Sequence, residues 1–213
     1  QRFETESFIE GITLPNNSTE LDLLELGFFM NGLTGMNHSW SFSAILDGNG
    51  KSNESTASDV QTDAQQAKLR LDGSYSLPFG TNWLFATRAT YVYSNDPLVD
   101  SQKFSLGGPY SVRGYAPAEL RGDEGAFLSL ELRKYFFVGG YPLAGSLFVD
   151  GGFAETIPYA DTPAETDLES ELGSAGIGLL FSPDGGTFSG AIQYAQPIDN
   201  HTSPIGDDDG HLW

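Results

Sequence analysis

Cysteine is absent from the 213 residues, which excludes a disulfide framework, a thiolate metal site and a cysteine nucleophile. Basic residues are scarce: 10 lysines and arginines stand against 29 acids, so the formal net charge is −19. Because a nucleic-acid-binding surface needs lysine and arginine to neutralise phosphates, this balance argues against nucleic acid as a partner. Many of the acids gather in residues 155–171 and 199–209, which we predict to be largely loops.

Long apolar runs are also missing. The longest, residues 135–149, is too short for a membrane-spanning helix and is broken by a Gly-Gly-Tyr-Pro sequence. No secretory signal peptide is visible, because residues 1–8 lack a basic segment followed by an apolar core and lack a small-residue cleavage site. What the chain does contain is 26 glycines and 13% aromatic residues, a mixture that favours strands and turns.

An alternation of apolar and polar residues with a period of two runs through most of the chain. In residues 128–133, leucines alternate with serine, glutamate and arginine, and residues 67–77 show the same period. This is the period of a β-strand, whose successive side chains point to opposite faces. We predict ten strands on this basis. They cover residues 2–14, 19–32, 37–47, 65–77, 82–94, 125–137, 143–155, 170–181 and 187–196, and a last strand begins near residue 210.

The lengths of these strands and of their connections favour an outer-membrane β-barrel. Most strands have ten residues or more, and about 9–11 tilted residues cross a bilayer. Long loops at one rim and tight turns at the other are typical of such barrels. Short turns are predicted at 33–36, 78–82, 138–143 and 182–186, and long polar loops at 48–64, 95–124, 156–169 and 197–209. Only the first connection, at 15–19, is short where a long one is expected.

We therefore predict an all-β protein, an antiparallel transmembrane β-barrel with long extracellular loops and short periplasmic turns. Aromatic residues at opposite ends of one strand, Trp83 and Phe85 against Tyr91 and Tyr93, fit the two interfacial girdles of such a barrel. A soluble acidic β-sandwich of adhesin type would show the same alternation and is the alternative. Since the last strand has only "GHLW" before the sequence stops, we expect the chain to be incomplete at its C-terminus. We expect the same at the N-terminus, because residue 1 already lies in strand pattern.

The loop predicted at 95–124 differs from the other long loops because it is rich in glycine around one arginine. Its sequence "GGPYSVRGY" contains Arg113. Glycines allow the backbone to fold back inside a confined lumen, where an arginine is costly unless a carboxylate meets its planar fork. Strand parity turns Asp150 and Glu131 towards the lumen, so we predict them as partners of Arg113, Asp150 first. The alternatives are a solvated loop arginine and an aspartate in a simple β-bulge.

Three motifs, "GGPYSVRGY", "GDEGAFLSLEL" and "LFVDGG", follow one another between residues 104 and 153. In this order they resemble the signature region of the two-partner secretion transporters, the haemolysin secretion/activation type within the POTRA-domain outer-membrane barrel superfamily. Val-Arg-Gly-Tyr matches the tip of that superfamily's lumen-inserted loop, and the aspartate of the third motif matches the residue that pairs with the loop arginine. The functional loop motif implied by the resemblance consists of Gly107, Gly108, Val112, Arg113, Gly114 and Tyr115.

The resemblance also implies where the chain lies in a whole barrel. In that family the motif loop follows the eleventh of sixteen strands, whereas here it follows the fifth predicted strand. Residues 1–213 would then be the C-terminal part of the barrel, about ten strands, with the first strands and the POTRA modules outside the chain. Residues 1–94 carry no motif and match by strand pattern alone.

The function implied by the resemblance is that of an outer-membrane protein translocase. Such a transporter exports a partner exoprotein, of haemolysin or adhesin type, through its pore without ATP. We accordingly expect no enzyme activity, no cofactor, a Gram-negative outer membrane with its lipid and lipopolysaccharide, and a monomeric barrel. The alternatives are a barrel assembly factor (an insertase) of the same superfamily and the barrel anchor of a surface-displayed passenger enzyme.

Neither a catalytic residue nor a specific metal site is predicted. The sequence has no G-x-S-x-G, S-x-x-K or H-E-x-x-H pattern. Three consecutive acids, Asp207, Asp208 and Asp209, lie between His201 and His211, which invites a metal reading. Their spacing differs from the alternate acids of a calcium loop and is typical of a solvated surface loop.

Overall fold

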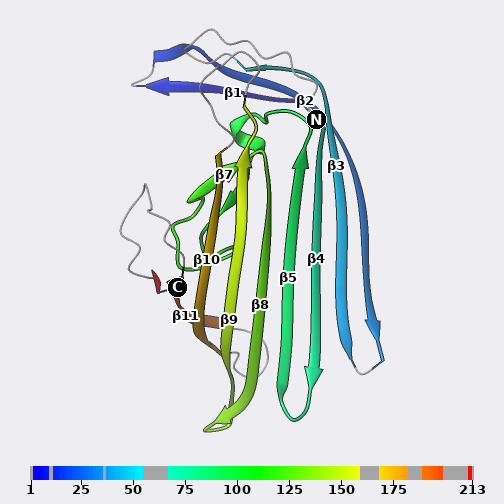
Figure 1. Ribbon diagram of the computed structural model, residues 1–213, viewed down its shortest axis with the longest axis vertical. Helices are drawn as coiled ribbons and strands as arrows, with labels where there is room; N and C mark the ends of the chain where they lie inside the picture. The colour runs from blue at the N-terminus through cyan, green and yellow to red at the C-terminus, as the bar shows by residue number, and fades with distance from the viewer. Residues whose placement is uncertain are drawn as a thin grey trace.

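The computed structural model describes residues 2–9, 12–35, 37–54, 67–158, 168–181, 189–198 and 211–212. Ten strands form one antiparallel sheet in the order in which they occur along the chain, which confirms the predicted meander (Figure 1). The strands are β1 (Arg2–Ile9), β2 (Ile12–Thr34), β3 (His38–Glu54), β4 (Ala67–Phe79), β5 (Trp83–Ser94), β8 (Glu124–Val138), β9 (Tyr141–Thr156), β10 (Leu168–Phe181), β11 (Gly190–Pro197) and β12 (His211–Leu212). No helix of the described residues is long and apolar enough to span a membrane.

Strand lengths in the middle of the sheet suit a bilayer crossing. Strands β4, β5, β8, β9 and β10 have 13, 12, 15, 16 and 14 residues, against the roughly 9–11 that a tilted crossing needs. The turns β2–β3, β4–β5 and β8–β9 lie at one end of the sheet, where tight turns were predicted (Figure 1). Strand β3 reaches Glu54, so part of the loop predicted at 48–64 is strand instead.

The turn predicted at residues 15–19 is wrong. The chain reverses between β1 and β2, where Ile9 pairs with Ile12, and β2 runs through "PNNST". The register shifts between the pairs Phe8–Thr13 and Glu6–Ser18, so β2 has four intervening residues where β1 has one. The turn-forming residues are therefore taken up as an irregularity within the strand pairing, which is where proline and extra residues are tolerated in a sheet.

The two faces of the sheet differ in chemistry. We call the face covered by the connection between β5 and β8 the inner face, and the opposite one the outer face. In β9, the inner residues Phe148 and Asp150 are 3% and 1% exposed, whereas the outer residues Leu147 and Val149 are 58% and 50% exposed. Exposed apolar side chains continue across the outer face. They include Leu46, Phe42, Tyr91, Leu128, Leu130, Ile177, Leu179, Ile192 and Tyr194.

The core lies between the inner face and the connection that covers it. Buried apolar side chains of this connection pack against side chains of β5, β8, β9 and β10. The cluster consists of Val92, Phe104, Leu106, Val112, Tyr115, Phe127, Ala154 and Leu172. Other buried inner-face side chains are polar, among them Thr90, Ser129, Asp150 and Ser174. The sheet thus has an apolar outer face and a largely polar inner one, as expected for lipid outside and water inside.

Candidate functional site: the arginine loop

Residues 95–123 connect β5 to β8 and fold back along the inner face. The connection contains a short 3-10 helix, η1 (Asp100–Gln102), and a two-stranded hairpin formed by β6 (Phe104–Leu106) and β7 (Leu120–Gly122). This hairpin ties the two ends together, with Phe104 opposite Gly122 and Leu106 opposite Leu120. We call the part between the two hairpin strands, residues 107–119, the arginine loop. It lies against β8 to β11 rather than extending away from the sheet (Figure 1).

Glycine conformation sets the path of the loop at its start. Gly107 and Gly108 have φ of +101° and +96°, which residues with a side chain rarely adopt. A Cβ at Gly107 would overlap the carbonyl oxygen of Ala116. The Ser111 hydroxyl accepts a hydrogen bond from the Gly107 N–H at 2.8 Å and lies 3.1 Å from the Gly107 carbonyl oxygen. The glycines predicted for flexibility therefore serve a single, closely packed conformation.

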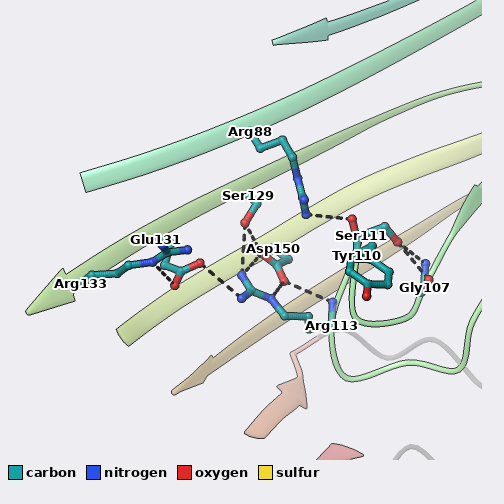
Figure 2. Close-up of polar contacts among 9 residues, drawn as sticks. All are labelled: Arg88, Gly107, Tyr110, Ser111, Arg113, Ser129, Glu131, Arg133 and Asp150. Atoms are coloured by element: carbon teal, nitrogen blue, oxygen red, sulfur yellow. Dashed lines mark hydrogen bonds and ion pairs between the residues drawn. The ribbon is translucent and has the colours of Figure 1, made fainter. Parts of the chain in front are cut away.

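Arg113 lies at the centre of the loop and meets Asp150 of β9. Its Nε donates to Asp150 Oδ2 at 2.6 Å and its Nη2 donates to Oδ1 at 2.8 Å, so the pair is bidentate (Figure 2). The backbone N–H of Arg113 also donates to Oδ2, at 3.2 Å. Arg113 is 5% exposed and Asp150 1%. The strand register is continuous through Asp150, so the simple β-bulge considered as the alternative is absent there.

The remaining contacts of the guanidinium come from β8 and β9. Nη2 donates to Ser129 Oγ at 3.2 Å, and Ser129 in turn donates to Asp150 at 2.6 Å. Nη1 lies 3.4 Å from Glu131, which also pairs with Arg133 at 2.8 Å. The carbon Cζ of Arg113 lies 3.4 Å from the centroid of the Phe148 ring, a cation–π geometry. The charge of Arg113 is thus met by one bidentate carboxylate, one longer ion pair and an aromatic face.

The other residues of the Val-Arg-Gly-Tyr motif are buried against the same strands. Val112 is fully buried, and Tyr115, 1% exposed, donates its hydroxyl to the carbonyl oxygen of Gly173 at 2.9 Å. Gly114 has φ of +98°, and a Cβ there would lie 3.4 Å from Ala195. All four residues therefore contact the inner face, and together they reach from β8 to β11.

Several contacts were not anticipated from the sequence. Ser129 and Asp150 are register partners on β8 and β9, and parity alone could have placed both on the inner face. Asp123, inside the quoted "GDEG", is fully buried and accepts hydrogen bonds from the N–H groups of Leu98 and Ile157, both at 2.8 Å. The motif predicted no role for this aspartate, because its hydrogen-bond partners lie 25 and 34 residues away along the chain.

Metal ligation finds no support in the described part of the chain, which contains no group of three or more histidine, aspartate or glutamate side chains able to hold an ion. The residues considered for a metal site, 201–211, lie almost entirely outside the described residues. Residues 159–167 and 199–210, which contain most of the two acidic stretches, also lie outside the described residues.

Comparison with known proteins identifies the family. Residues 1–181 match the family of the haemolysin secretion/activation proteins ShlB/FhaC/HecB. The chain belongs to this family. The match favours the secretion branch of the superfamily that the motifs predicted, and it locates the chain in the bacterial outer membrane. The ten strands are therefore part of an antiparallel outer-membrane barrel and not of a soluble sandwich.

Similar proteins agree with the family. The heme/hemopexin transporter protein HuxB of Haemophilus influenzae (strain 86-028NP) is 33% identical over 133 residues, 62% of this chain and 22% of HuxB. The fold is similar to that of CdiB from Escherichia coli, with a TM-score of 0.73 and 20% identity over 96% of this chain and 38% of CdiB. BamA from Haemophilus ducreyi gives a TM-score of 0.61 and 20% identity over 92% of this chain and 41% of the BamA structure. The chain spans less than half the length of each.

Proposed function

We propose that this chain is part of a two-partner secretion transporter that exports a partner exoprotein through the lumen of its barrel. The observation that carries the proposal is the buried, bidentate Arg113–Asp150 pair, which holds a glycine-rich loop against the inner face of a sheet from this family. Residues 95–124 would then be a loop inserted into the lumen, where its position shapes the space available to a passing polypeptide.

The role proposed for the loop is positional and includes no covalent step. Arg113 acts by tying the loop to β8 and β9. Removing one partner of such a buried pair leaves the other charge unpaired, which costs about 3–5 kcal/mol. We propose that export proceeds without ATP and that folding of the partner outside the cell helps to draw it through. The chain is then a transporter and not an enzyme.

The proposal extends to the surroundings of the chain. We propose that the first strands of the barrel and its POTRA modules lie outside residues 1–213, in keeping with the 38% of CdiB that the chain covers. The exposed leucine, valine and isoleucine side chains of the outer face support contact with membrane lipid and lipopolysaccharide. We also propose that the barrel works as a monomer.

The test is export by the full-length protein carrying Arg113→Ala, in cells that also make its partner. We expect the folded barrel to reach the outer membrane at the normal level, measured by heat-modifiable gel mobility, while the secreted partner falls by at least about tenfold. Arg121→Ala is the matched control, because Arg121 lies on β7 of the same connection but pairs with Asp100 at an exposed site. Normal secretion by a folded Arg113→Ala barrel would contradict the proposed role of the loop.

A further inference from the structure

Basic side chains gather at one place on the inner face although the chain as a whole is strongly acidic. Arg70 of β4, Arg88 of β5 and Lys103 line a polar pocket of about 420 Å³ between the arginine loop and these two strands. We call it the loop–wall pocket. Its loop side is formed by Ser105 and by residues 107–111. Asp72 lines it as well, so three bases face the pocket against one acid. A concave site with an excess of positive charge concentrates anions more strongly than the same charges on a flat surface.

Two of the three bases already have carboxylate partners. Arg70 forms a bidentate pair with Asp72, at 2.8 and 2.9 Å, and Thr90 donates a further hydrogen bond to the same carboxylate. Lys103 lies 3.7 Å from Asp123, whose two oxygens also accept backbone N–H groups. The positive charges of Arg70 and Lys103 are therefore largely balanced within the protein.

Arg88 is different, because it forms no ion pair within the described part of the chain. Its Nη2 donates to the carbonyl oxygen of Tyr110 at 2.8 Å (Figure 2). Its Cζ lies 5.2 Å from the centroid of the Phe127 ring. A neutral carbonyl and an aromatic face hold the guanidinium in place without cancelling its charge. Tyr110 is 85% exposed and lines the same pocket as Arg88.

The position of the pocket indicates what reaches it. The arginine loop covers the inner face of β8 to β11, whereas Arg70, Ser74 and Arg88 on β4 and β5 are exposed. A polypeptide that passes along the exposed part of β4 and β5 would therefore meet Arg88 and Tyr110 at the edge of the loop. A guanidinium that is already held in place loses little side-chain entropy when a carboxylate binds it, and its fork suits that group.

We propose that the loop–wall pocket is a binding subsite for an acidic side chain of the extended polypeptide in transit, with Arg88 as the residue that binds the carboxylate. This inference rests on the proposed export function. A single partly exposed charge pair binds weakly, which suits a chain that must be released at each step of its passage. Tyr110 adds an apolar and hydrogen-bonding surface beside the carboxylate without specifying a sequence.

Peptide binding to the full-length protein in detergent tests the subsite without requiring export. The probes are two unstructured fluorescent peptides of equal length, one containing aspartate and glutamate and the other asparagine and glutamine at the same positions. We expect the acidic peptide to bind about fivefold to tenfold more tightly, and Arg88→Gln to abolish this difference. Arg88→Lys should retain part of it. Arg121→Gln removes the same charge outside the pocket and should leave the preference for the acidic peptide unchanged.

A second pair of variants separates loss of the subsite from displacement of the loop, since Arg88 also holds the Tyr110 carbonyl. Ser105 is exposed and lines the pocket. Ser105→Asp, made together with Arg121→Gln because Arg121 lies opposite Ser105, supplies an internal carboxylate to the pocket while leaving Arg88 intact, so it should also abolish the preference for the acidic peptide. Ser105→Asn has the same size without the charge and should bind both peptides as the unmodified protein does.

Each outcome bears on the subsite directly. Equal binding of the two peptides, or an unchanged preference in Arg88→Gln, would overturn it. The subsite would also be overturned if inorganic phosphate displaced the acidic peptide and chloride at equal ionic strength did not. The pocket would then be a phosphate site. The proposed function fails separately, if the transporter secretes no partner. An Arg88-dependent preference would in that case still establish the carboxylate site.

Discussion

At the scale of single residues, the site depends on how unequally two carboxylates share one arginine. Asp150 accepts three hydrogen bonds from Arg113, including one from its backbone N–H, and is 1% exposed. Glu131 lies at 3.4 Å from the same guanidinium and also has Arg133 as a partner. The two acids were predicted together, with Asp150 first, and their geometry predicts different consequences of removal.

Neutralising each acid in turn should show this inequality. Asp150→Asn removes the bidentate acceptor and should weaken docking of the loop by about 3–5 kcal/mol, whereas Glu131→Gln should cost about 1 kcal/mol or less. The measurement is the rate of maleimide labelling of a cysteine introduced at Val112, which is fully buried in the docked loop. The 213 residues contain no cysteine of their own. Equal labelling rates in the two variants would show that the acids contribute equally.

At the scale of elements, the loop is held at two separate places. Its tip is tied by Arg113 and Tyr115 to the sheet, and its base is closed by the β6–β7 hairpin and by Asp123. Asp123 joins Leu98, at the entry of the connection, to Ile157, just after β9. One buried side chain therefore links two connections at the same rim of the sheet.

Replacing Asp123 by asparagine should loosen this base while the tip remains docked. The amide keeps one acceptor oxygen but turns its NH₂ towards a backbone N–H, so one of the two hydrogen bonds is lost, at about 1–3 kcal/mol. Hydrogen exchange should accelerate at the amides of Leu98 and Ile157 and stay slow at Arg113. In the control, Asp100→Asn, the affected side chain is 70% exposed and exchange at both amides should stay unchanged.

At the scale of the whole molecule, the two faces of the sheet decide what it can contact. The outer face presents apolar side chains such as Leu147 and Val149, and the inner face presents serine, arginine and glutamate. In water the outer face would be a large exposed apolar surface, whereas in a bilayer it contacts lipid. Membership of an outer-membrane family and the strand lengths are consistent with a bilayer crossing.

An added charge should therefore have opposite effects on the two faces. Val149→Arg places a cation on the lipid side and should destabilise the full-length barrel by about 2–4 kcal/mol if the residue lies near the bilayer midplane. Ser76→Arg puts the same charge on the inner face of β4 and should be nearly neutral. Urea unfolding in phospholipid vesicles measures both. A similar loss in the two variants would mean that the outer face does not contact lipid.

Local pattern was sufficient for much of this protein. A period of two, read along each segment, predicted the ten strands and their faces, because parity within a strand depends only on neighbouring residues. Parity also placed Asp150 and Glu131 on the face that meets Arg113, and the motif directed attention to that arginine. The turn predicted at 15–19 failed because turn-forming residues can also be absorbed within a strand pair.

Register and the path of the loop required the tertiary structure. Ser129 lies beside Asp150 because β8 and β9 pair in one particular register, and Phe148 lies under the guanidinium because the loop docks on this part of β9. Asp123 closes the base of the connection, and Arg88 faces the Tyr110 carbonyl, through contacts between residues 22 to 34 positions apart. Such contacts depend on long-range packing that no local periodicity encodes. The sequence by itself thus determined which residues face inwards, and the tertiary structure decided which of them meet.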